Sequence, residues 1–130
     1  MRTRARAEVD VFAAVPAATR PIVEAARTAV LAAAGDCEAV ACGAKKPKSP
    51  SMLWKLVRFS VNGQTVATIG TFTKHANMFF ARGAELEDPG GILQGTGKTL
   101  RYLTLRTAAD ARREAVAKVL RAAFALARES

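Results

Sequence analysis

The chain has 130 residues, of which 50% are hydrophobic, and a formal net charge of +9. This length suits one domain with a buried core, and we expect residues 1–130 to form a single domain. Two cysteines, Cys37 and Cys42, and one histidine, His75, exclude a disulfide framework and a self-sufficient structural zinc site, which needs four ligands. No uncharged apolar run approaches the length of about 18 residues that spans a membrane. These features predict a cytoplasmic protein without a membrane partner.

The positive charge is concentrated in the middle of the chain. Residues 1–38 are neutral overall and residues 85–130 carry a small excess of cations. Residues 39–84 contain no Asp or Glu and carry these cations: Lys45, Lys46, Lys48, Lys55, Arg58, Lys74 and Arg82. A field of this sign attracts phosphates and carboxylates. The distribution is explained either by a solvated basic surface or by a surface that binds an anion or a nucleic acid.

Residues 19–34 are predicted to form an amphipathic helix. Pro21 lies in its first turn, where a missing N–H costs nothing, and Gly35 is a typical stop. Apolar residues recur at helical spacing, namely Ile22, Val23, Ala26, Val30 and Ala33. We expect one short helical turn over residues 9–14 and a disordered segment over residues 1–8.

A second helix is predicted over residues 108–128. Thr107 and Asp110 have the spacing of a capping box, in which two side chains satisfy backbone N–H groups at the start of a helix. The apolar stripe of this helix consists of Val116, Val119, Leu120, Ala123, Phe124 and Ala127. We therefore expect this stripe to be buried.

Between the helices the apolar period changes to two, which is typical of strands. Strands are predicted over residues 53–61, 66–72, 76–82 and 99–106, with a short first strand over residues 37–42. Asn62-Gly63 is the preferred two-residue hairpin turn. The order of elements predicts an α+β two-layer sandwich, in which an antiparallel sheet of four to five strands packs its N- and C-terminal helices on one face.

The string Gly95-Thr96-Gly97-Lys98-Thr99 invites comparison with a phosphate-binding loop. That motif needs a glycine where Ile92 stands and a helix after the lysine, whereas residues 99–106 alternate as a strand. The sequence therefore argues against nucleotide hydrolysis. The turn can still hold a small anion through its N–H groups and Lys98. The alternative is a tight turn that only needs a positive φ.

Cationic donors lie near the ends of the predicted strands. His75, Arg82, Lys98 and Arg101, together with the turn Gly95, Thr96 and Gly97, are predicted to form a pocket for an anionic small molecule or an acidic protein surface. If the two strands are antiparallel neighbours, Arg82 and Lys98 lie at the same sheet end, whereas His75 starts nearer the far end. His75 has no recognisable nucleophile beside it in the sequence, so we predict a binding module without a cofactor and not an enzyme.

Nucleic-acid binding is the alternative interpretation of the charge. Proteins that bind single strands combine a basic groove with aromatic side chains on which bases stack. Trp54, Phe72 and Tyr102 are the candidates for exposed stacking residues, whereas the other aromatic residues occupy alternating positions typical of a core. An exposed strand edge would favour pairing into a homodimer.

The segment from Lys74 to Arg106 resembles the YdhG-like family, a domain of unknown function. The similarity rests on His75, the string Arg82-Gly-Ala-Glu-Leu, and the turn Gly95-Thr-Gly-Lys-x-x-Arg, and extends to the terminal helices. The resemblance implies a frataxin-like fold, and some members are described as iron chaperones for iron-sulfur cluster or haem assembly. The sequence departs from the family in two places. It has Cys42-Gly-Ala-Lys-Lys-Pro47 where many members carry Trp-Gly-x-Pro, and it has few of the carboxylates that Fe²⁺ prefers as ligands. Those carboxylates are sparse and matched by arginines over residues 1–38, namely Glu8, Asp10, Glu24, Asp36 and Glu38.

Overall fold

The computed structural model describes residues 17–41, 54–72, 74–87 and 91–129. Their elements are α2 (Arg20–Ala34), β1 (Glu38–Ala41), β2 (Trp54–Val61), β3 (Gln64–Thr71), β4 (Ala76–Phe80), the 3-10 turn η1 (Gly83–Glu85), β5 (Arg101–Leu105), α3 (Ala108–Ala111) and α4 (Glu114–Glu129). The turn expected over residues 9–14, the disorder expected over residues 1–8, Cys42 and the basic loop Lys45–Pro50 lie outside the described residues. Among the described helices, none is long and apolar enough to cross a membrane.

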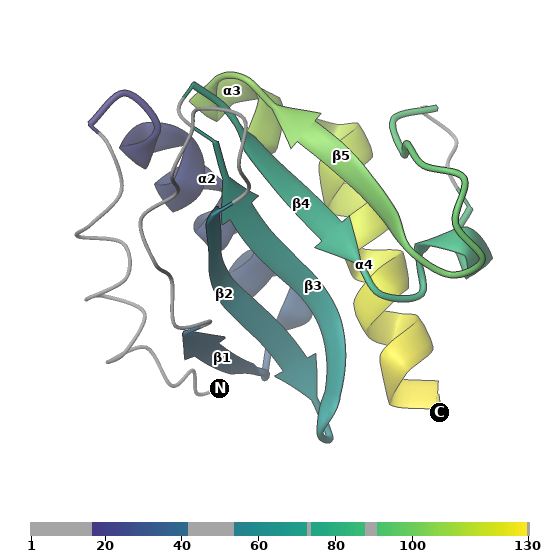
Figure 1. The fold of residues 1–130 in the computed structure, drawn as a ribbon. Helices are drawn as coiled ribbons and strands as arrows, with labels where there is room; N and C mark the ends of the chain where they lie inside the picture. The colour runs from purple at the N-terminus through teal and green to yellow at the C-terminus, as the bar shows by residue number, and fades with distance from the viewer. Residues whose placement is uncertain (1–16, 42–53, 73, 88–90, 130) are drawn as a thin grey trace.

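The five strands form one antiparallel sheet in chain order, as Figure 1 shows. The hairpin predicted at Asn62-Gly63 is confirmed, with φ values of 52° and 77° at the two turn residues. Positive φ at both positions is the geometry that matches the right-handed twist of the flanking strands. The pairing of β2 with β3 shifts register twice, between Lys55 and Val57 and between Phe59 and Ser60. The predicted α+β class and antiparallel sheet are therefore confirmed.

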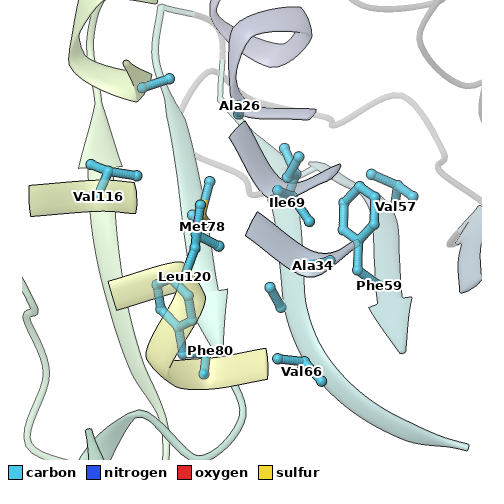
Figure 2. Packing of buried hydrophobic residues seen from close by; sticks show 14 of the residues in the cluster. Ala26, Ala34, Val57, Phe59, Val66, Ile69, Met78, Phe80, Val116 and Leu120 are labelled. Carbon is cyan, nitrogen blue, oxygen red and sulfur yellow. The ribbon is translucent and has the colours of Figure 1, made fainter. Parts of the chain in front are cut away.

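Both long helices cover the same face of the sheet, behind the strands in the view of Figure 1. Figure 2 shows the core between the two layers, with Leu120 of α4 and Ala34 of α2 above sheet residues such as Met78 and Phe59. Alternate sheet residues on this side are fully buried: Val57, Phe59, Ile69, Met78, Phe80, Leu103 and Leu105. Burial of apolar surface stabilises a fold by about 25 cal/mol per Å², and it is the dominant stabilisation of such a two-layer fold.

The single helix predicted over residues 108–128 is wrong, because the chain forms α3 and α4 with a break at Arg112 and Arg113. The capping box is present, since Thr107 Oγ1 accepts from the N–H of Asp110 at 3.2 Å. No Gly or Pro marks the break. The two helices share α2 as a neighbour but pack on different strands, since α3 contacts β5 whereas α4 contacts β2 and β3. The predicted apolar stripe of α4 is buried throughout.

Candidate functional site

The face of the sheet opposite α2 and α4 carries no helix among the described residues, and we call it the open face. Side chains alternate between the two faces of a strand, so the residues between the buried positions point to this side. The strand register arranges them in rows across β2 to β5. The open face consists of Arg58, Thr68, Gly70, Phe72, His75, Asn77, Phe79, Tyr102, Thr104 and Arg106.

Two aromatic pairs lie on the open face. Phe79 of β4 is paired with Tyr102 of β5, with ring centroids 5.9 Å apart and an interplanar angle of 43°. Phe72 and His75 stack with centroids 4.5 Å apart and an angle of 17°. All four side chains are partly exposed. His75 and Phe79 are four residues apart on one strand, so the two pairs are separated by roughly 13 Å.

Asn77 lies between the two aromatic pairs and is the most buried polar residue of this region. Its side chain is 8% exposed, and Oδ1 is a buried oxygen without a hydrogen-bond partner among the described residues. The residue directly opposite on β3 is Gly70, and on β5 it is Thr104, whose hydroxyl accepts from Gln94 at 3.4 Å. Buried polar atoms are nearly always hydrogen-bonded, so an unpartnered acceptor requires an explanation.

His75 is held by its ring and its backbone. Its carbonyl oxygen accepts from the N–H of Phe72 at 2.8 Å and from the hydroxyl of Thr71 at 3.2 Å. Partial burial and, secondly, the positive charge of Arg106 lower the pKa of His75 below its ordinary value. Among the described residues, the imidazole makes no hydrogen bond or ion pair with an Asp, Glu or Cys. His75 therefore lies beside a cation without a carboxylate to compensate it.

Arg82 and Lys98, which the sequence predicted to be neighbours, lie at the end of the sheet opposite His75. β4 and β5 are antiparallel and adjacent, so Arg82 and Lys98 lie at the same sheet end. Arg82 is already engaged, since its Nε and Nη2 donate to Glu85 at 2.7 and 2.9 Å and its Nη1 donates to Gln64 at 3.3 Å. The hydrogen bond with Arg82 holds the pKa of Glu85 below its usual value.

The glycine turn is closed by Arg101. Gly95 has a φ of 115°, a conformation that favours glycine, and Thr96 is exposed. Nη1 of Arg101 donates to the carbonyls of Gly97 and Leu100 at 2.6 and 2.8 Å. The turn therefore offers carbonyl oxygens to the guanidinium. This interaction gives Arg101 a structural partner within its own loop.

Close packing also explains Gly83, in the string after Arg82. A Cβ atom on Gly83 would lie 2.4 Å from Cβ of Arg101 and 2.8 Å from its backbone nitrogen. Real atoms do not approach this closely, so the β4–η1 corner requires a residue without a side chain. The glycine allows η1 to pack directly against the first residue of β5.

The structure separates His75 from the other predicted site residues. His75 precedes the first residue of β4 and Arg82 follows its last, which places them roughly 20 Å apart at opposite ends of the strand. Asn77, Phe79 and Arg106 were not among the predicted site residues. The alternation of positions 75, 77 and 79 in β4 would have indicated the first two, once the limits of the strand were fixed.

A second basic region lies on the helix side. A groove of about 480 Å³ runs between α2 and the α3–α4 corner, with an alanine floor and with Arg112, Arg113 and Arg121 at its rim. Arg121 donates to Glu114 at 2.9 Å, and Glu24 also lines the groove. Among the described residues, no three His, Cys, Asp or Glu side chains are grouped as metal ligands.

Comparison with known proteins gives no match to any family model, curated protein or solved structure. The similarity to the YdhG-like family therefore stays a prediction from the residues quoted above.

Proposed function

We propose that this protein is a non-catalytic binding module whose open face holds an anionic ligand, either a small molecule or an acidic group on a partner. The observation that carries the proposal is the placement of His75 and Arg106, which are the next residues beyond the paired Ala76 and Leu105 at one end of β4 and β5. Two groups that are cationic or can become so lie together, and no described carboxylate is paired with either. An anion bound between them would relieve this unfavourable juxtaposition, because opposite charges within a few ångströms stabilise the protonated form.

The open face and its margin carry two further positive charges, on Arg58 and Lys74. Arg58 is exposed and lies opposite Thr68, three strands away from Tyr102. Lys74 is exposed and directly precedes His75. Within the described part of the chain, neither forms an ion pair. The described acids near this face are Glu38, which lies opposite Ser60 at the β1 edge, and Asp110, whose carboxylate accepts from the backbone N–H of Arg106. A surface of one sign concentrates anions near it.

The predicted sheet-end residues are a rival location for the same activity. Lys98 is exposed there and can contact an anion. Arg82 and Arg101 would first have to give up Glu85 and the carbonyls of the glycine turn. That exchange reduces the net gain from a new charge-assisted hydrogen bond. The open face is favoured because its cations have no such partners among the described residues.

Membership of the YdhG-like family and a frataxin-like fold remain part of this proposal, on the strength of the sequence similarity. Iron delivery is the other function that the similarity implies. The described acids Glu24, Asp36 and Glu38 form no metal-binding group with a His, a Cys or another acid in the parts of the chain that the structure describes. No observation therefore favours iron over an anion. We also propose a cytoplasmic location, because two cysteines are too few for a disulfide framework.

Calorimetric titration with tripolyphosphate at low ionic strength tests the proposal. Three double variants each remove two positive charges: Arg58→Gln with Arg106→Gln on the open face, Arg82→Ala with Lys98→Ala at the sheet end, and Arg112→Gln with Lys118→Gln on the helix side. We expect the open-face pair to weaken binding by about tenfold or more, and the other two pairs to change it by less than about threefold.

The matched charge change in the three variants separates a local site from a general field effect. Equal weakening in all three would show that tripolyphosphate responds only to net charge, which contradicts the proposal. Selective loss in the Arg82 and Lys98 pair would instead locate the site at the sheet end. Selective loss in the Arg112 and Lys118 pair would locate it on the helix side.

A further inference from the structure

We infer that the anionic ligand of the open face is a single-stranded nucleic acid, whose bases stack on Phe79 and Tyr102 and meet the amide of Asn77. This inference rests on the proposed function and names its ligand class. It draws on three observations that a simple anion does not require: partly exposed aromatic pairs, an unpartnered buried acceptor, and cations at the margins of the same face.

The aromatic pairs provide planar surfaces at two places on one sheet. Phe79 and Tyr102 lie side by side on β4 and β5, and Phe72 and His75 stack at the end of β3 and β4. RNA-binding domains that use an open sheet stack two or three bases on aromatic side chains in this way. Such stacking tolerates any base, because every base has a flat π-face. A phosphate or a carboxylate has no planar ring to use these positions.

The amide of Asn77 supplies a polar group between the two aromatic pairs. Its Oδ1 lacks a partner among the described residues, and the residue paired with it on β3, Gly70, has no side chain that could supply one. A carboxamide carries one acceptor oxygen and one donor NH₂ group, and in Asn77 the buried oxygen is the atom left without a partner. An amide of this kind pairs with the edge of a base, most characteristically with N6 and N7 of adenine. A base N–H would thus satisfy the acceptor that the free protein leaves unpaired.

The cations are placed where a phosphodiester backbone could follow the aromatic positions. Arg106 acts on His75 at one end of the face, and Arg58 lies in the same row as Phe79 and Tyr102 at the other. The Asp110 carboxylate accepts from the backbone N–H groups of Arg106 and Thr107, and no ion pair joins it to the Arg106 guanidinium among the described residues. Cations therefore lie at both ends of the row of aromatic residues.

The test is fluorescence anisotropy with a labelled oligodeoxyadenylate of about eight nucleotides, compared with an abasic oligomer of the same length and charge. We expect the abasic oligomer to bind at least about tenfold more weakly, since stacking contributes about 1–3 kcal/mol per base and 1.4 kcal/mol corresponds to a factor of ten. An oligoglutamate peptide of equal charge serves as competitor and should displace the oligonucleotide poorly.

Matched variants connect the binding to the named residues. Tyr102→Leu should weaken oligonucleotide binding about tenfold and Tyr102→Phe should preserve it, because only the first removes the ring. Asn77→Val should weaken binding of the oligonucleotide and leave binding of the abasic oligomer unchanged. The folded state of each variant is checked by circular dichroism and by Tm.

The outcomes distinguish binding of a nucleic acid from binding of any anion on the open face. Equal affinity for the oligonucleotide and the abasic oligomer would overturn the nucleic-acid assignment and leave the anion site intact. Stronger binding of oligoglutamate than of the oligonucleotide would overturn it in favour of an acidic partner. Absence of binding to all three polyanions would overturn both.

Discussion

Asn77 of β4 lies directly opposite Gly70 of β3, so the most buried amide of the open face has no side chain beside it on that strand. The carboxamide oxygen has no partner, although the backbone around it is fully paired within the sheet. Such a group lowers stability by about 1–3 kcal/mol relative to a satisfied one. Features of this kind persist where a bound ligand can use them.

The first prediction concerns the stability of the free protein. Replacing Asn77 by Val removes the unpartnered acceptor and introduces a residue that favours strands, so the free energy of unfolding should rise by about 1 kcal/mol. Thermal unfolding should then show a Tm that is higher by a few degrees. A decrease of similar size would mean that Oδ1 has a stabilising partner such as an ordered water, and would remove the basis for assigning Asn77 to a ligand.

The second prediction concerns pH. The pKa of His75 is lower in the folded protein than its ordinary value of 6.5, so the unfolded chain binds the proton first. This contribution to stability is therefore complete above about pH 6.5, declines as the pH falls toward the folded pKa, and is constant below it. Unfolding by urea at several pH values should show this decline in the wild type and a smaller decline in His75→Phe, which keeps a ring against Phe72. An equal decline in both proteins would contradict the assignment.

The same linkage predicts the pH dependence of binding. An anion beside His75 favours the imidazolium and should raise the pKa of His75, so the affinity for tripolyphosphate should increase as the pH falls below about 6.5. The His75→Phe variant should show a flatter profile. Chemical shifts of the imidazole during a pH titration, with and without the anion, measure the change in pKa directly. No change in the pKa of His75 would place the anion elsewhere.

The fourth prediction concerns the corner between β4 and η1. Gly83→Ala introduces a Cβ that cannot fit beside Arg101 without a backbone shift, so stability should fall by about 1–3 kcal/mol. Ala84→Ser, at the exposed neighbouring residue, should change stability by less than about 0.5 kcal/mol. Urea unfolding of both variants tests the difference. Similar stabilities would show that the corner relaxes freely.

The fifth prediction concerns salt. If the open face holds a single strand, log K for the oligonucleotide falls linearly with log of the salt concentration, by about 0.7 for each phosphate neutralised. The variant Arg58→Gln with Arg106→Gln should reduce this slope by about 1.4, because two contacts are lost. The control pair on the helix side should retain the wild-type slope. A slope that is the same in all proteins would exclude contacts from these two arginines.

Local patterns predicted much of the fold. The Asn62-Gly63 turn predicted one hairpin, the period of two predicted the strands, and the period of 3.6 identified the buried face of α4. The shared sheet end of Arg82 and Lys98 followed from the antiparallel order alone. These features depend on neighbours in the sequence, which is why they could be predicted.

The features that the sequence did not predict depend on tertiary contacts, which the spacing of residues does not encode. The break between α3 and α4 has no Gly or Pro to signal it, and the two helices pack on different strands. Arg101 suits an anion by its chemistry, but its guanidinium is used by two carbonyls of its own turn. The neighbours of His75 depend on the strand register. The same register determines which residues share the open face.

A titration of uniformly ¹⁵N-labelled protein with tripolyphosphate, followed by NMR, locates the anion site residue by residue. We expect the largest shifts in the side-chain amide of Asn77, in the backbone of His75 and Arg106, and in the neighbouring residues of β4 and β5. The amides of α2 and α4 should stay nearly constant. Shifts confined to the helix groove around Arg112 and Arg121, or to the turn at residues 95–101, would contradict the assignment of the binding site to the open face.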